Sequence, residues 1–313
     1  MAQTNALQEN SFQGNKFPII DTHQHLWDLS KFNLPWAAGS DILNRSYVTS
    51  DYLAATAGLN VVKAVYMEVD VATDQKDAEA DYIIAQCQRG DTPTVAAVIS
   101  GFPASPDFKT YISRFQGNPY VKGLRQVLHG PETGPGYCLQ PAFVQGVQLL
   151  GQLGLRFDLC LRPAELGDAV KLVDQCPNTH FILDHCGNAD PYIIAEPNSA
   201  DAVDPANPMD HTRRQWMADI EALAARPSVV CKISGIVARA RPGWTAKDLA
   251  PTINHCLDAF GPDRVVFGGD WPVCTLGASY AQWVNALKEV IAVRSEADQR
   301  KLLHDNAAQI YGV

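Results

Sequence analysis

The sequence lacks any apolar run of the roughly 18 residues that a membrane-spanning helix needs. Its eight cysteines include no Cys-x-x-Cys pair, which disfavours a zinc–thiolate site and is typical of free thiols in a reducing compartment. Residues 1–18 lack the basic and apolar regions of a secretory signal, so we expect them to form a flexible polar leader. These absences favour a cytoplasmic protein with no membrane contact.

Clusters of Lys and Arg are also absent. The 34 acidic residues outnumber the 25 basic ones, which gives a formal net charge of −9. A nucleic-acid partner requires clustered positive charge, so nucleic acid is excluded and a small molecule is the expected ligand. The hydrophobic fraction of 46% indicates a globular protein with a sizeable core.

Strand-like and helix-like segments alternate along the chain from residue 19 to its end. The eight strand-like segments are residues 19–25, 61–69, 94–100, 121–127, 155–161, 180–185, 229–233 and 264–267. Strands that alternate with helices pair in parallel, and eight such units predict a single (β/α)8 TIM barrel over residues 19–313. An open doubly wound sheet is the alternative, but no Gly-x-Gly-x-x-Gly motif follows the first strand.

Polar side chains occur where several of these strands end, which is where barrel enzymes have their active sites. His23 and His25 lie one residue apart on the first strand, so their side chains share a face and can bind one metal ion. His185 ends the sixth strand and Asp270 the eighth. Three histidines and one carboxylate suit zinc, and also manganese or iron.

Other polar residues near the strand ends have more than one interpretation each. Glu68 is either a metal or substrate ligand or the partner of a nearby cation. Arg125 either makes a surface ion pair or binds an anionic or carbonyl oxygen of the substrate. The second role is favoured because its guanidinium binds carboxylates in a bidentate manner. His129 is a substrate contact or a loop hydrogen-bonding group. Asp158 contacts the substrate, orients a ligand histidine or pairs with Arg125.

The loops contribute further candidates. Trp27 and Trp36 bracket the loop after the first strand, and they either cover the barrel mouth or contact the substrate. Lys232 lies within the seventh strand, where a structural ion pair is expected. Arg239 and Arg241 follow that strand as solvated charges or substrate contacts. The irregular segment 188–210 is a lid or a contact with a second copy of the chain in a homo-oligomer.

Five segments resemble the amidohydrolase superfamily: DTHQHLW, LDHCGN, CKISG, FGGDWPV and the closing HDNAAQIYGV. They are most similar to a branch that includes sugar-acid lactonases and the pyrone-dicarboxylate and sulfomuconolactone hydrolases. The resemblance implies that His23, His25, His185 and Asp270 are metal ligands, and that Asp270 and His185 are catalytic.

Two departures from the superfamily pattern limit the metal site. Arg125 and Gln126 stand where a bridging Lys or Glu often occurs on the fourth strand, and Asp158 stands in place of the fifth-strand histidine. The resemblance therefore implies one divalent metal, zinc or manganese, and not two. Some members of the branch work without metal, which leaves a metal-independent enzyme as an alternative.

The expected reaction is hydrolysis of a lactone, a cyclic ester, in carbohydrate metabolism. Asp270 takes a proton from the attacking water and returns it to the leaving alkoxide. A sugar-acid lactone is favoured because the mouth holds Arg125 and only two further loop arginines. The alternatives are a metal-dependent decarboxylase of the related branch, and a barrel that only binds a ligand.

Overall fold

The computed structural model describes residues 17–196, 203–204 and 206–313. The leader expected over residues 1–18 therefore lies, except for its last two residues, outside the described part. So does a portion of the irregular segment expected over residues 188–210.

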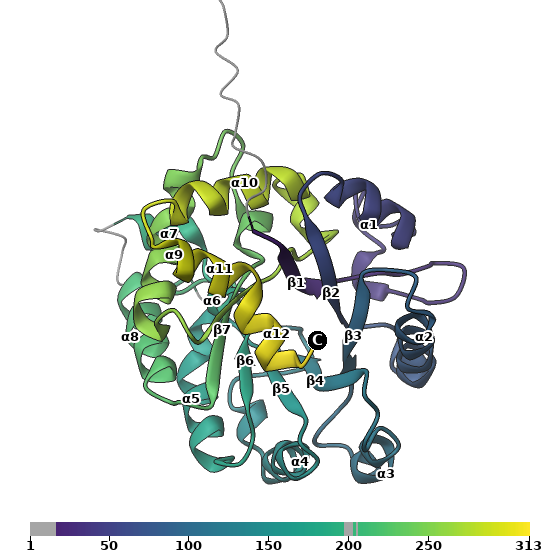
Figure 1. The fold of residues 1–313 in the computed structure, drawn as a ribbon. Coiled ribbons are helices and arrows are strands. Elements are labelled where there is room, and N and C mark those ends of the chain that lie inside the picture. The colour runs from purple at the N-terminus through teal and green to yellow at the C-terminus, as the bar shows by residue number, and fades with distance from the viewer. Residues whose placement is uncertain (1–16, 197–202, 205) are drawn as a thin grey trace, which may run out of the picture.

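Eight parallel strands form one sheet in the order β1 to β8, which confirms the predicted barrel (Figure 1). The strands are β1 Ile19–Gln24, β2 Val61–Met67, β3 Thr94–Ser100, β4 Val121–Val127, β5 Arg156–Cys160, β6 Phe181–Leu183, β7 Val229–Ile233 and β8 Val265–Phe267. Most of their residues are buried, as expected for parallel strands that are covered on both faces.

Helices surround the strands as an outer layer (Figure 1). The longer ones are α1 Thr49–Thr56, α2 Lys76–Arg89, α3 Phe108–Ser113, α4 Pro141–Gln152, α5 Leu166–Gln175, α8 Arg213–Ala224, α9 Ala246–Phe260 and α10 Tyr280–Ile291. Two short helices, α6 His185–Asn188 and α7 Pro191–Ala195, follow β6. Helix α7 corrects the expectation of an irregular segment from residue 188: Pro191 is its first residue, and the Asp190 side chain caps it by accepting from the Tyr192 amide.

The C-terminal segment closes one end of the barrel. Helix α11 Glu296–Arg300 continues through a π-helical turn, Lys301–Asp305, into α12 Asn306–Tyr311, which crosses the ring of strands in Figure 1. Ala307 and Tyr311 pack with Ile20, Val65 and Val98 in a small inner core, separate from the larger core between strands and helices. This packing leaves the opposite end, where the strands have their carboxyl termini, as the open mouth.

Strands β1 and β8 meet through a short pairing. The Asp270 amide donates to the His23 carbonyl at 2.8 Å, and the His25 amide donates to the Trp271 carbonyl at 2.8 Å. Gln24, the last residue of β1, forms a parallel bridge with Trp271, which lies in the segment after β8. The first and last strands of the barrel are therefore held together directly beside the histidine pair.

A buried carboxylate strengthens this junction. Asp21, which is 0% exposed, accepts from the amides of His23 at 2.9 Å and Gly269 at 2.7 Å. It also accepts from the hydroxyls of Tyr52 at 2.9 Å and Tyr280 at 3.0 Å. Four donors compensate a carboxylate that would otherwise cost several kcal/mol to bury.

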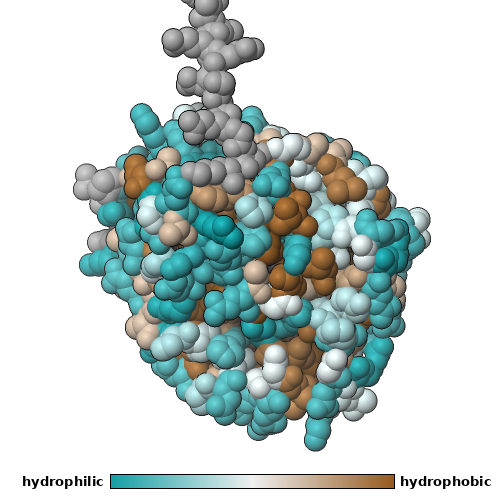
Figure 2. Space-filling view, in the orientation of Figure 1, coloured by the Kyte–Doolittle hydropathy of each residue, from teal (hydrophilic) through white to brown (hydrophobic). Residues whose placement is uncertain are grey.

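The surface is mainly hydrophilic on the face shown in Figure 2, and its hydrophobic residues form small separate patches. Within the described ranges, no helix is long and apolar enough to cross a membrane.

The hydrogen bonds to Asp21 predict a stability difference between two buried tyrosines. Tyr280→Phe removes a donor to a buried carboxylate, so we expect the free energy of unfolding to fall by about 1.5–3 kcal/mol. Tyr311→Phe is the matched control, because the Tyr311 hydroxyl is buried without a hydrogen-bond partner in the described structure. Urea denaturation measures both; equal losses would contradict the role given to Asp21.

Candidate active site

The four residues expected as a cluster do converge at the barrel mouth. His25 Nε2 lies 3.4 Å and His23 Nε2 3.6 Å from Asp270 Oδ1. The rings of His23 and His185 are 4.4 Å apart, and one ligand atom each from His23, His185 and Asp270 lie within 4.8 Å of one another. Side chains from β1, from the first residue of α6 and from the segment after β8 therefore face a single point.

An unusual backbone conformation directs the side chains of His185 and Asp270 toward this point. His185 and Asp270 both have left-handed backbones, with φ of 54° and 53°. A non-glycine residue in this region costs about 1–3 kcal/mol, and such residues concentrate at functional sites. Gly235 makes room for His185, since a Cβ there would lie 2.2 Å from its Nδ1, and Gly268 makes room for His23 in the same way. The glycines in CKISG and FGGDWPV thus have a packing reason.

Hydrogen bonds orient the imidazoles. His25 Nδ1 lies 3.0 Å from the Met67 carbonyl, so it donates there and its Nε2 presents a lone pair toward Asp270. His185 Nδ1 lies 2.9 Å from Ser234 Oγ, so this contact engages Nδ1 and not Nε2. Burial lowers the pKa of His185, and with it the charge of the ring near neutral pH. Histidines held this way at Nδ1 are typical of metal sites.

A network of buried charges lies beneath the histidines. Lys232 Nζ is 2.8 Å from Asp184 Oδ1 and 2.9 Å from Asp158 Oδ2. Arg125 donates from Nε to Glu68 Oε1 at 2.5 Å, and its Nη1 lies 3.4 Å from Asp184 Oδ2. All five residues are between 0% and 4% exposed, so each charge depends on its partners for compensation.

The network also contacts His23 from both sides. Lys232 Nζ lies 3.3 Å from His23 Nδ1, and Arg125 Nη1 lies 3.3 Å from His23 Nε2. Burial and the positive charge of Lys232 lower the pKa of His23 well below its usual range. Burial would raise the pKa of Asp184, but Lys232 and His23 bring it well below the ordinary value. Burial raises the pKa of Asp158 to about 7.

A cavity of about 540 Å³ opens above the cluster. Its polar lining consists of His25, Asp70, Arg125, His129, His185, Arg239 and Asp270. Its apolar lining includes Trp36, Val69, Val273 and Leu276. This mixture, with a few convergent polar groups in an apolar wall, is typical of small-molecule sites.

Trp27 does not lie where we expected a substrate contact. It is 0% exposed, donates from Nε1 to the Arg45 carbonyl and packs against Tyr47. Trp36, which is 42% exposed and donates to the Val69 carbonyl, lines the cavity instead. The loop folds back over β1, so the nearer tryptophan in sequence becomes core.

The structure does not support Glu68 as a metal or substrate ligand, or Asp158 as a substrate contact. Glu68 pairs with Arg125, and its other oxygen accepts from the Asp70 amide at 2.7 Å. Asp158 pairs with Lys232 at the bottom of the site and does not line the cavity. Both are therefore left out of the ligand set proposed below.

The remaining candidates divide between cavity and surface. Arg125, His129 and Arg239 line the cavity, whereas Arg241 stacks on the Tyr192 ring at 4.2 Å outside it. Lys232 forms the ion pair expected from the sequence. Asp184 was not among the predicted site residues, although a carboxylate after Phe-Ile-Leu was a signal that it needed a buried cation.

The donor atoms fit a divalent metal. Three imidazoles with their Nδ1 atoms engaged or shielded and one carboxylate provide nitrogen and oxygen ligands of the kind zinc binds. His23, His25, His185 and Asp270 would hold the ion. The neighbouring Arg125 charge is compensated by Glu68 and Asp184, so an added cation would not face an unpaired one.

Fold and site together define a (β/α)8-barrel enzyme with a histidine–aspartate cluster at its mouth. Residues 20–313 match the amidohydrolase family model, and the chain belongs to this family.

Relatives of the chain include proteins named as sugar lactonases. It is 29% identical over 297 residues to an L-fucono-1,5-lactonase of Burkholderia multivorans, covering 92% of this chain and 94% of the relative. It is 23% identical over 350 residues to an L-rhamnono-gamma-lactonase of Scheffersomyces stipitis, covering 96% and 100%. The crystal structure of an amidohydrolase from Burkholderia multivorans with bound zinc is similar with a TM-score of 0.79 and 25% identity, covering 95% and 99%.

The ligand geometry predicts metal content. We expect dialysed protein to retain about one zinc ion per chain, because a site of this kind holds four protein ligands. His25→Asn should weaken zinc binding at least about tenfold, whereas His129→Asn, which changes a cavity histidine outside the cluster, should not. Elemental analysis after dialysis against a chelator series measures both; equal zinc retention in the two variants would contradict the ligand set.

Proposed function

We propose that the protein hydrolyses a lactone of a sugar acid. One observation carries the proposal: the Asp270 carboxylate lies 3.4 Å from His25 Nε2 and 3.6 Å from His23 Nε2, at a cavity that is closed below by a compensated charge network. A carboxylate in this setting can accept a proton from water. The sugar lactonases among the relatives support the cyclic ester as the substrate class.

Asp270 acts as the general base and then as the general acid. It accepts a proton from a water molecule whose oxygen attacks the ring carbonyl carbon. The ring C–O bond then breaks, and protonated Asp270 gives its proton to the leaving alkoxide, which yields the open hydroxy acid. His185 orients the water through its Nε2, and the positive charge of Arg125 stabilises the developing oxyanion.

A divalent metal held by His23, His25, His185 and Asp270 would polarise the carbonyl and lower the pKa of water. His23 and His25 lie against the Asp270 carboxylate. The protein therefore fixes the position of the general base relative to the cavity in which the substrate binds.

Arg239 binds oxygen atoms of the substrate. Its guanidinium is partly buried at the cavity wall, and within the described part of the chain no carboxylate forms an ion pair with it. Such a group has five donors and needs acceptors. The oxygens of a sugar lactone are suitable, and the exposed face of Trp36 provides an apolar surface for the ring on another side of the cavity.

Removing the base tests the mechanism. Asp270→Asn keeps the size of the side chain but cannot accept the proton, so kcat on a responsive lactone should fall by about 10²–10⁴-fold. A pH-indicator assay over a panel of sugar-acid lactones measures turnover, and urea denaturation verifies the fold. A folded, fully active variant would refute the assignment, and carbon dioxide release from an aromatic acid would favour the decarboxylase alternative.

Arg239 and Arg241 form a matched pair. Arg239→Ala should raise KM for the responsive lactone by about 10- to 100-fold, which corresponds to the loss of one or two charge-assisted hydrogen bonds. Arg241→Ala removes the same charge two residues away but outside the cavity, so KM should change little. Equal effects of the two substitutions would show that overall charge, and not contact, is responsible.

A further inference from the structure

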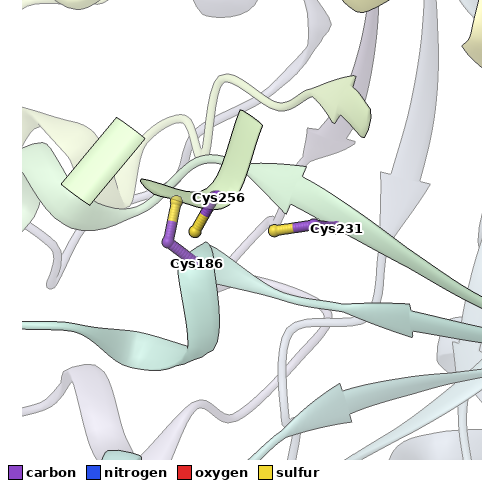
Figure 3. Close-up of side chains that lie close together, drawn as sticks. All are labelled: Cys186, Cys231 and Cys256. Carbon is purple, nitrogen blue, oxygen red and sulfur yellow. The ribbon is translucent and has the colours of Figure 1, made fainter. Parts of the chain in front are cut away.

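Three cysteines meet behind the barrel, on the side of β7 that faces the helices. Figure 3 shows Cys186 of α6, Cys231 of β7 and Cys256 of α9 with their side chains facing one another. All three are 0% exposed and free, and their sulfur atoms lie within 4.8 Å of one another. Because side chains alternate along a strand, Cys231 points outward while Lys232 points into the barrel.

The distances between the three sulfur atoms are close to those between sulfur atoms that bind one metal ion. Two thiolates that each bind an ion at about 2.3 Å are at most about 4.6 Å apart, and about 4.0 Å apart when three surround it evenly. The observed limit of 4.8 Å is therefore reached from a ligated arrangement by side-chain movements of a few tenths of an ångström. Among the described residues, the other five cysteines form no comparable cluster of three cysteines.

The chemistry of the group selects the kind of ion. It offers sulfur only, since no imidazole or carboxylate joins these three in the described residues. Zinc in closed protein sites takes four ligands, whereas thiolate-only sets favour soft ions such as Cu(I). A monovalent ion with one thiolate and two thiols is neutral overall, which matters because an uncompensated charge is costly to bury.

We propose that Cys186, Cys231 and Cys256 form a Cu(I) site that is distinct from the histidine–aspartate cluster. As the first S–Cu bond forms, one thiol gives up its proton to solution, the other two sulfurs donate lone pairs, and no electron is transferred. Free cysteines are also common as small core residues. The convergence of three of them from separate elements on one point is what distinguishes a ligand set from packing.

Copper content tests the proposal. Since the three side chains have no exposed surface, copper should be supplied while the full-length protein is synthesised, and the protein purified without oxygen. We expect about one copper per chain in the wild type and at least tenfold less in Cys256→Ser, since even changes next to a metal ligand cost about 10- to 100-fold in affinity. Cys87→Ser, a buried cysteine of α2, is the matched control and should retain the metal.

Two further measurements separate this site from the others. X-ray absorption at the copper edge should show sulfur neighbours only, and His25→Asn should keep its copper while it loses zinc. Lactone turnover should be unchanged in Cys256→Ser, so failure of the copper site and failure of the proposed hydrolase function are distinguishable. Copper absent from the wild type, bound through nitrogen, or retained in Cys256→Ser would overturn the proposal.

Discussion

Charge compensation inside the barrel is the constraint on which the site depends. Arg125 and Lys232 are the two cations available to Glu68, Asp158 and Asp184, and none of the five has more than 4% of its surface in solvent. Removing one partner of such a pair typically costs about 3–5 kcal/mol, because the remaining charge stays buried. The network is therefore rigid, and it holds the His23 ring from both sides. The buried ion pairs beneath the mouth thus fix the position of the His23 ring at the mouth.

The fold separates the tasks of its two ends. At the end opposite the mouth, helix α12 fills the barrel with apolar side chains, so the ring of strands is a packed core and not a pore. The mouth, in contrast, gathers polar groups that the strands deliver from far apart in the chain. Small residues make this possible: Gly235 leaves space for the imidazole of His185, and Gly268 leaves space for the Cβ atom of His23. Backbone and side chain are thus fitted to one another around the cluster.

The sequence allowed the eight strands and the convergence of His23, His25, His185 and Asp270 to be predicted, since both follow from strand periodicity and barrel topology. Pairings inside the barrel could not be predicted. Arg125 and Asp158 are neighbours in the β4–β5 register, yet Asp158 pairs with Lys232 on β7. Which of two tryptophans lines the cavity depends on how a loop folds. The cluster of Cys186, Cys231 and Cys256 could not be predicted either, because sequence periodicity does not give distances between strands and helices of different layers.

The Asp21 junction has a consequence for the order in which the protein is made. Asp21 and the Gly269 amide it binds are 248 residues apart, nearly the whole length of the barrel. His23 and His25 are synthesised well before Asp270, the carboxylate that joins them at the mouth. Until the segment around Gly269 is available, the edge of β1 that does not pair with β2 therefore stays open, and the two imidazoles lack their carboxylate. Such long-range closure is slow, so the nascent chain passes through an open, inactive sheet before the enzyme exists.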